Sequence, residues 1–198
     1  MRKKRIGRLA AGILCMLLAV SVMNPAPTVN AASKKEKAKA AYQEYLTPYV
    51  GFVDQVRFAI LDINNDKVPE LITATGTAFS YNIYSYTGGK VKYLATSQNG
   101  KISIYPNKKL VFISNVGNGG YSSREFMKFD GKKMVPLAVK TRQATDYTLT
   151  KFKTTYTVKG KKATKSKYNT YIKRLKKGAK KKKPTFHIVT TNNLKKYL

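Results

Sequence analysis

The sequence predicts a mainly β protein of the α+β class. We expect an antiparallel β-meander, either a single sheet or a blade-like sandwich, with one N-terminal and one C-terminal amphipathic helix. Short apolar segments with a period of about two fill the middle of the chain, and turn-forming pairs such as Gly88-Gly89 and Asn99-Gly100 separate them. Helical spacing of apolar residues occurs only towards the two ends. No long helical pattern interrupts the strands, which argues against a parallel sheet.

Residues 1–31 have the pattern of a secretory signal peptide. Residues 2–8 are rich in cations, residues 9–23 are apolar, and residues 29–31 (Val-Asn-Ala) match the small-residue rule for cleavage. The apolar run is shorter than the about 20 residues of a membrane span, although an uncleaved anchor is the alternative. We therefore expect a secreted, extracellular or cell-wall-associated protein that begins at Ala32 or Ser33. The single cysteine, Cys15, lies within the segment to be removed.

Residues 32–50 are predicted to form the N-terminal helix. Ser33 is followed three residues later by Glu36, which is the capping-box pattern of a helix start. Apolar side chains then recur at helical spacing on one side, and Pro48 ends the regular helix. The stripe consists of Ala38, Tyr42, Tyr45, Leu46 and Tyr49.

Residues 51–198 are predicted to form the β-meander domain, which includes a C-terminal helix and a basic tail. The expected strands are 57–62, 69–75, 81–86, 91–96, 101–105, 110–114, 123–129, 134–140, 149–158 and 186–189. The C-terminal helix is expected over residues 166–177, because Tyr168, Tyr171 and Leu175 recur at helical spacing. Gly178 is placed to end this helix. The lysine run at residues 180–183 is expected to form a mobile loop.

A short acidic segment at residues 62–70 has the spacing of a cation-binding loop. Oxygen-bearing side chains occupy its first, third, fifth and ninth positions, so a tight loop can direct them at one centre. Calcium prefers such an all-oxygen cage. The candidate ligands are the side chains of Asp62, Asn64, Asp66 and Glu70 and the backbone carbonyl of Val68. The alternative is a hairpin loop closed by hydrogen bonds from Asp and Asn side chains to the backbone.

This D-x-N-x-D-x-x-P-E-L segment resembles the calcium loop of FG-GAP-type β-propeller repeats. It is more closely similar to small secreted Gram-positive proteins of undefined activity that carry a single loop of this kind. The Tyr-rich and Gly-Lys-Val strands of those proteins have counterparts here at residues 81–86 and 89–91. The resemblance implies weak calcium binding by the same five residues. Those proteins usually have glycine where this chain has Asn65 and Lys67.

Positive charge dominates the C-terminal part of the chain. The whole sequence has 39 Lys and Arg against 9 Asp and Glu. Residues 147–198 contain 17 Lys or Arg and no acidic residue. Such a surface attracts polyanions, and the expected partners are wall teichoic acid, an anionic membrane surface or extracellular DNA. The candidate contact residues are Lys173, Arg174, Lys176, Lys177, Lys180, Lys181, Lys182 and Lys183.

The alternative for this charge is a solvated surface that only resists aggregation. Lysine far outnumbers arginine, which favours contact with phosphates over the reading of bases. We expect a monomer with no dedicated protein partner.

The sequence contains no evident catalytic constellation. His187 is the only histidine, and no G-x-S-x-G segment occurs. We therefore predict a non-catalytic binding or surface-associated protein. The alternative is an extracellular hydrolase that uses a carboxylate pair such as Glu70 and Asp130.

Overall fold

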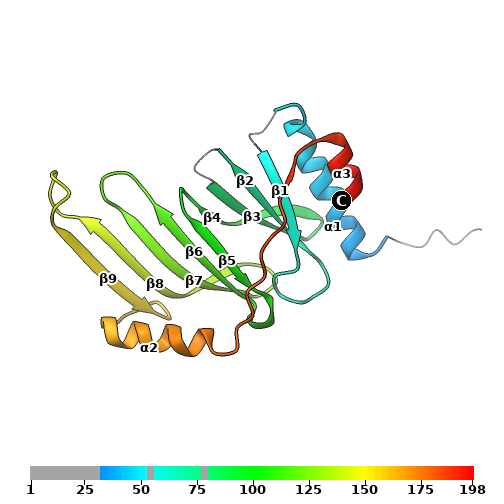
Figure 1. The fold of residues 1–198 in the computed structure, drawn as a ribbon. Coiled ribbons are helices and arrows are strands. Elements are labelled where there is room, and N and C mark those ends of the chain that lie inside the picture. Colours follow the sequence, from blue (N-terminus) through cyan, green and yellow to red (C-terminus); the bar gives the residue numbers. More distant parts are fainter. Residues whose placement is uncertain (1–31, 53–55, 77–79) are drawn as a thin grey trace, which may run out of the picture. The chain divides into compact units, whose positions relative to one another are not determined.

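The computed structural model describes residues 32–52, 56–76 and 80–198. The predicted signal peptide lies outside these residues. Within them the chain is mainly β, with antiparallel sheets and short helices, which confirms the predicted fold class (Figure 1). None of the described helices has the length and apolar composition needed to cross a membrane.

The strands form two antiparallel sheets. Sheet A has the order β11-β1-β2-β3-β4 and sheet B the order β10-β9-β8-β7-β6-β5. The strands of sheet A are β1 (Val56–Leu61), β2 (Glu70–Thr75), β3 (Ser80–Thr87), β4 (Lys90–Ser97) and β11 (His187–Ile188). Those of sheet B are β5 (Lys101–Tyr105), β6 (Leu110–Val116), β7 (Ser122–Phe129), β8 (Met134–Ala144), β9 (Phe152–Val158) and β10 (Lys161–Lys162). The sandwich is therefore the arrangement adopted, with the predicted meander divided between the two sheets after β4.

The helices are α1 (Lys34–Leu46), α2 (Lys165–Lys176) and α3 (Thr191–Tyr197), with short 3₁₀ turns η1 (Thr47–Tyr49) and η2 (Pro106–Lys108). The capping box of α1 is confirmed, since Ser33 Oγ accepts the N–H of Glu36 and the Glu36 carboxylate accepts the N–H of Ser33. Helix α2 begins one residue earlier than predicted, because the Thr164 side chain caps it. Helix α3 was not predicted, because one buried residue, Leu194, is too weak a periodic signal.

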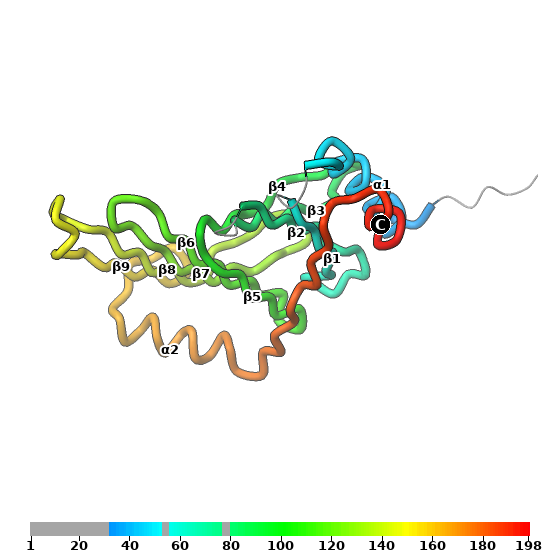
Figure 2. Tube along the Cα trace, turned by 45° about the horizontal axis from the view of Figure 1, so that its top comes forward, coloured from blue at the N-terminus to red at the C-terminus, as the bar shows by residue number. Residues whose placement is uncertain are grey.

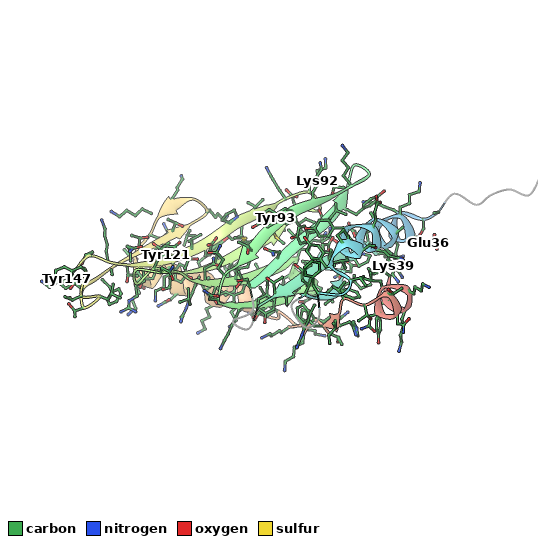
Figure 3. All side chains as sticks on the ribbon, turned by 90° about the horizontal axis from the view of Figure 1, so that it is seen from above. Glu36, Lys39, Lys92, Tyr93, Tyr121 and Tyr147 are labelled. Atoms are coloured by element: carbon green, nitrogen blue, oxygen red, sulfur yellow. The ribbon has the colours of Figure 1, made fainter. Side chains whose placement is uncertain are left out.

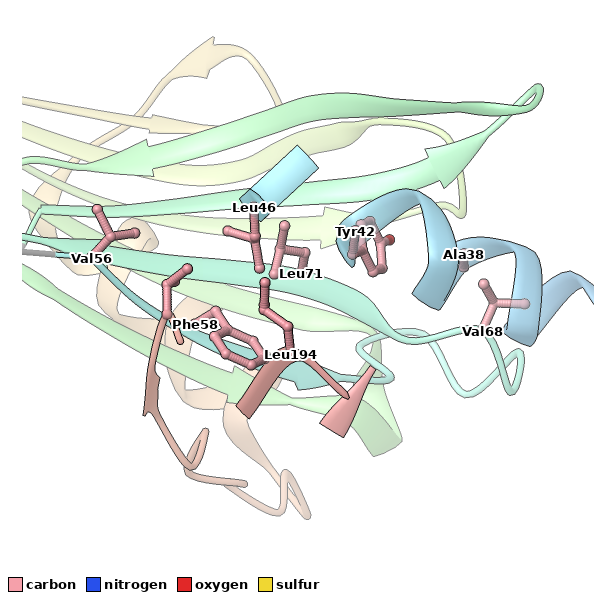
Figure 4. Packing of buried hydrophobic residues seen from close by; sticks show 9 residues of the cluster. Ala38, Tyr42, Leu46, Val56, Phe58, Val68, Leu71 and Leu194 are labelled. Atoms are coloured by element: carbon pink, nitrogen blue, oxygen red, sulfur yellow. The ribbon is translucent and has the colours of Figure 1, made fainter. Parts of the chain in front are cut away.

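Apolar side chains point alternately to the two faces of each sheet, and this alternation produces four layers: α1 with α3, sheet A, sheet B and α2. In β2, Leu71 packs with α1 and α3, whereas Ile72 packs in the core between the sheets. In β6, Val111 belongs to that same core, and Leu110 faces α2. Because successive side chains of a strand point to opposite faces, each sheet contributes to two cores. Figures 1 and 2 show the result, with α1 and α3 on sheet A and α2 along sheet B, and Figure 4 shows the outer core of sheet A.

The C-terminal segment after α2 crosses from one sheet to the other. The N–H of Lys180 donates to Asn107 Oδ1 at 2.9 Å, and the N–H of Lys182 donates to the Ile104 carbonyl at 2.9 Å. Strand β11 then pairs with β1, and Leu194 of α3 enters the core beside α1. Where the sequence predicts a mobile loop and a tail, the structure has a segment whose backbone is hydrogen-bonded to sheet B and whose end completes sheet A.

Candidate functional site

The loop at residues 62–69 joins β1 to β2 and is held by its own polar side chains. The Asp62 carboxylate accepts the N–H groups of Asp66 at 3.2 Å and Lys67 at 2.8 Å. Asn64 Oδ1 also accepts the Asp66 N–H at 3.2 Å, and Asp66 Oδ1 accepts the N–H of Val68 at 2.9 Å. These are the backbone hydrogen bonds of an Asx-closed turn, and they hold the three side chains on the inside of the loop.

Two residues of this loop adopt left-handed backbone conformations. Asn65 has φ 58° and Lys67 has φ 68°. At these two positions, the small secreted proteins whose loop this segment resembles usually have glycine. For Lys67 this conformation costs about 1–2 kcal/mol, because its Cβ crowds the following carbonyl. The backbone therefore takes the form that glycine would favour, although neither residue is glycine.

Glu70 closes the loop from the first position of β2. Its side chain is 3% exposed, and its Oε2 accepts the N–H of Ile63 at 2.8 Å. Burial, and to a smaller extent the nearby charges of Asp66 and Asp62, raise the pKa of Glu70 to about 8. Three carboxylates thus gather with no basic side chain paired to them among the described residues, and a bound cation would offset their mutual repulsion.

The ligand chemistry of the loop fits a hard cation. In the described ranges, no three His, Cys, Asp or Glu side chains form a metal site by themselves. A site here would need the Asn64 amide oxygen and the Val68 carbonyl beside the carboxylates. Such mixed oxygen ligands are those that calcium uses in loops.

The loop also touches three other parts of the fold. Tyr42 of α1 donates its hydroxyl to the Pro69 carbonyl at 3.0 Å, and Asn65 Nδ2 donates to the Pro106 carbonyl of η2 at 3.3 Å. A Cβ at Gly131, in the turn between β7 and β8, would lie 3.4 Å from Asn64 Nδ2. The loop therefore connects helix α1 and sheet A to two turns of sheet B.

A second candidate site is a groove of about 1170 Å³ between α2 and the outer face of sheet B. Tyr168 and Tyr171 of α2 are buried with Phe126 and Ala138 of the sheet, and the groove runs beside this contact. Seven cations line it: Arg124, Lys140, Lys165, Lys173, Arg174, Lys176 and Lys177. No Asp or Glu is among the described residues of this lining.

The floor of the groove consists of cross-strand pairs. Phe112 of β6 lies opposite Phe126 of β7, with ring centroids 4.9 Å apart. Arg124 precedes Phe126 by two positions on β7, so the two side chains lie on the same face of the sheet. Arg124 lies directly opposite Lys140 of β8. Neither cation forms an ion pair within the described part of the chain, and the Lys140 Nζ lies 5.9 Å from the ring centroid of Tyr156. Directly opposed like charges are destabilising, so a bound anion would relieve a repulsion that the fold builds in.

Helix α2 provides the wall of the groove. Lys165, Asn169, Lys173 and Lys176 follow one another at helical spacing and all line the groove. Residues at such intervals share one side of a helix, so three lysines face the groove along most of the length of α2.

The eight predicted polyanion contacts do not lie together in one site. Lys173, Arg174, Lys176 and Lys177 line the groove. Lys182 and Lys183 instead line a smaller hollow of about 260 Å³ beside His187 and Tyr197. Lys180 and Lys181 line neither of the two.

Arg124, Lys140 and the aromatic floor of the groove are not predicted from the sequence. The sequence indicates only that Arg124 and Phe126 share one face of β7, because side chains alternate along a strand with a period of two. Nothing in the sequence indicates that α2 lies over that face.

The residues considered for catalysis differ in their exposure and in their contacts. The ring of His187 stacks on Tyr197 at 3.6 Å, within the contacts of β11 and α3. Asp130 is exposed, and hydrogen bonds from the N–H groups of Lys133 and Lys132 lower its pKa. Glu70, in contrast, is buried beneath the acidic loop.

Comparison of the chain with protein-family models, with curated proteins and with solved structures finds no match.

Proposed function

We propose that this chain is a secreted, non-catalytic cationic protein that binds anionic polymers or surfaces of the cell envelope. The observation that carries the proposal is the groove between α2 and sheet B, where seven cations gather without an acidic neighbour in the lining. The net charge of the full sequence is +30, and only five of its cations lie in the predicted signal peptide, so the remaining positive charge adds long-range attraction for any polyanion.

The binding should come mainly from the release of counterions. Each phosphate that a lysine neutralises contributes a slope of roughly −0.7 to −0.9 in log K against log salt. Lysine ammonium groups are mobile point charges with no fixed hydrogen-bond geometry, so they discriminate poorly between anionic polymers.

Point substitutions test the proposal better than truncation, because the C-terminal segment is part of both sheets. The double variant Lys173→Gln/Lys176→Gln removes two groove cations while keeping long side chains. The matched control is Lys90→Gln/Lys92→Gln, on exposed positions of β4; Lys92 is labelled in Figure 3. Retention on polyphosphate, teichoic acid and anionic vesicles is measured from about 50 to 500 mM salt.

We expect the groove variant to bind more weakly than the control and its salt slope to shrink by roughly 1.4 to 1.8. Equal losses in the two variants would mean that the charge acts diffusely and that the groove is not the site. Binding that ignores salt would contradict the proposal altogether. Circular dichroism checks that both variants are folded.

We also propose that the loop at residues 62–70 binds calcium weakly, in the range of about 10⁻⁴–10⁻³ M that is typical of extracellular modules. The supporting observation is the left-handed backbone of Asn65 and Lys67 together with three clustered carboxylates. The ligands would be Asp62, Asn64, Asp66 and Glu70 with the Val68 carbonyl. Bound calcium would balance the charge of these carboxylates and hold the loop against its neighbours.

A further inference from the structure

We propose that the groove beside α2 accepts single-stranded nucleic acid, with its bases against the aromatic floor and its phosphates on the flanking cations. This inference rests on the proposed function and narrows it to one class of polyanion. It depends on how rings and charges are distributed along the groove.

Three aromatic side chains of sheet B are part of the groove. Tyr105, Phe112 and Tyr156 are partly exposed, and all three line it. Phe112 packs against Phe126 of the next strand, and Tyr156 packs against Tyr168 of α2 at 5.2 Å between centroids, so both rings are held in place by a neighbouring ring. Fixed ring faces are the surfaces on which unpaired bases stack.

Cations lie among these rings on the sheet and along the helix that faces them. Lys165, Lys173 and Lys176 form the helical wall, and Arg124 and Lys140 lie across the floor on β7 and β8. At a rise of 1.5 Å per residue, the helical cations extend along roughly 16 Å. Charge spread along a groove matches a chain of repeated phosphates, which a single lipid headgroup does not provide.

The other anionic polymers leave one part of the groove unused. A polyol phosphate such as teichoic acid has no flat ring to place on Phe112 and Tyr105. Double-stranded DNA keeps its base faces stacked inside the helix. Only a single strand offers phosphates and accessible ring faces together, which is the combination used by sequence-tolerant single-strand binders.

The test compares two oligomers with the same phosphates. Fluorescence anisotropy measures binding of the mature chain to labelled oligothymidine and to an abasic oligomer of equal length. We expect oligothymidine to bind at least about tenfold tighter, since stacking contributes about 1–3 kcal/mol per base. Equal affinity for the two would overturn the inference and leave the proposed polyanion binding in place. Binding of neither would overturn both.

Ring-deleting variants then locate the effect. Tyr105→Leu and Phe112→Leu each remove one ring but keep an apolar side chain and every charge. The two substitutions are made in separate variants, so that the test can still be carried out if one of them does not fold. We expect each to weaken binding of oligothymidine several-fold and to leave binding of the abasic oligomer unchanged. A parallel loss for both oligomers would contradict stacking, as would tighter binding of teichoic acid, anionic vesicles or duplex DNA than of oligothymidine.

Discussion

The buried carboxylate of Glu70 accepts the backbone N–H of Ile63 at 2.8 Å. Ile63 is 0% exposed and belongs to the core between the two sheets, whereas Glu70 is a candidate ligand of the acidic loop. One hydrogen bond therefore joins the polar interior of the loop to the apolar centre of the protein. Any change in the charge of Glu70 should therefore change the free energy of unfolding of the whole protein.

The first prediction concerns pH, for protein kept free of metal by a chelator. The folded chain has a Glu70 pKa of about 8, above its ordinary value of 4.5. Between these pH values the folded chain holds a proton that the unfolded chain has released. The free energy of unfolding should therefore fall as pH rises from about 4.5 to about 8.

Glu70→Gln should remove this dependence, because glutamine is neutral and still offers an oxygen to Ile63. The variant should match the parent near pH 4 and exceed its stability near pH 9. Urea unfolding at several pH values measures the difference, with the exposed Glu44→Gln as control. An unchanged pH slope in Glu70→Gln would show that another group titrates.

The second prediction concerns calcium and Lys67. Calorimetry of the mature chain should show heat at millimolar calcium, and Lys67→Gly should tighten binding several-fold. Glycine relieves a left-handed strain of about 1–2 kcal/mol and removes a positive charge near the cation. Lys67→Ala removes the charge and keeps the Cβ, so the difference between the two variants isolates the backbone contribution. If the parent gives no heat at millimolar calcium, the loop is a hydrogen-bonded turn only.

The third prediction concerns the contact between α1 and the acidic loop. Tyr42 is fully buried, and its hydroxyl donates to the Pro69 carbonyl at 3.0 Å. Tyr42→Phe should lower the free energy of unfolding by about 1–3 kcal/mol, since a buried carbonyl loses its partner. Thermal or urea unfolding measures it, with the exposed Tyr49→Phe as control. If the two variants are equally stable, water or a shifted neighbour satisfies the Pro69 carbonyl.

The fourth prediction concerns the C-terminal segment as part of the fold. Leu194 of α3 is 3% exposed and packs in the core with Tyr42 and Leu46 of α1. Leu194→Ala should cost about 2–5 kcal/mol of stability, as expected for a buried leucine. The neighbouring exposed Lys195→Ala should cost far less, and urea unfolding compares them. A loss within about 0.5 kcal/mol for Leu194→Ala would show that α3 is dispensable.

The fifth prediction concerns export. Intact-mass measurement of the exported protein should find a chain that begins at Ala32 or Ser33. Helix α1 would survive either cut, because the Ser33 nitrogen that donates to Glu36 remains in the mature chain. A mass that retains residues 1–31, with the protein in the membrane fraction, would indicate an anchor.

Much of the local structure follows from the sequence alone. The S-x-x-E pattern predicts the start of α1, and the period of two predicts the strands, because both depend on neighbours within a few residues. The spacing of Asp62, Asn64 and Asp66 likewise predicts a tight turn whose side chains face inward. These features arise from short-range sterics and hydrogen bonds, so a short stretch of sequence is enough to specify each of them.

The tertiary structure alone decided where these pieces meet. Glu70 is buried because sheet B and α1 pack around the acidic loop, and no property of residues 62–70 indicates that. Arg124 and Lys140 are 16 positions apart in the sequence, yet strand register sets them opposite each other beneath α2. The charge of the lysine-rich C-terminal segment predicts a tail. In the structure, however, this segment extends to sheet A, and its few apolar residues complete the core between that sheet and α1. Long-range packing depends on which apolar faces of helices and sheets bury each other, and this depends on the sequence of the whole chain rather than on any short segment.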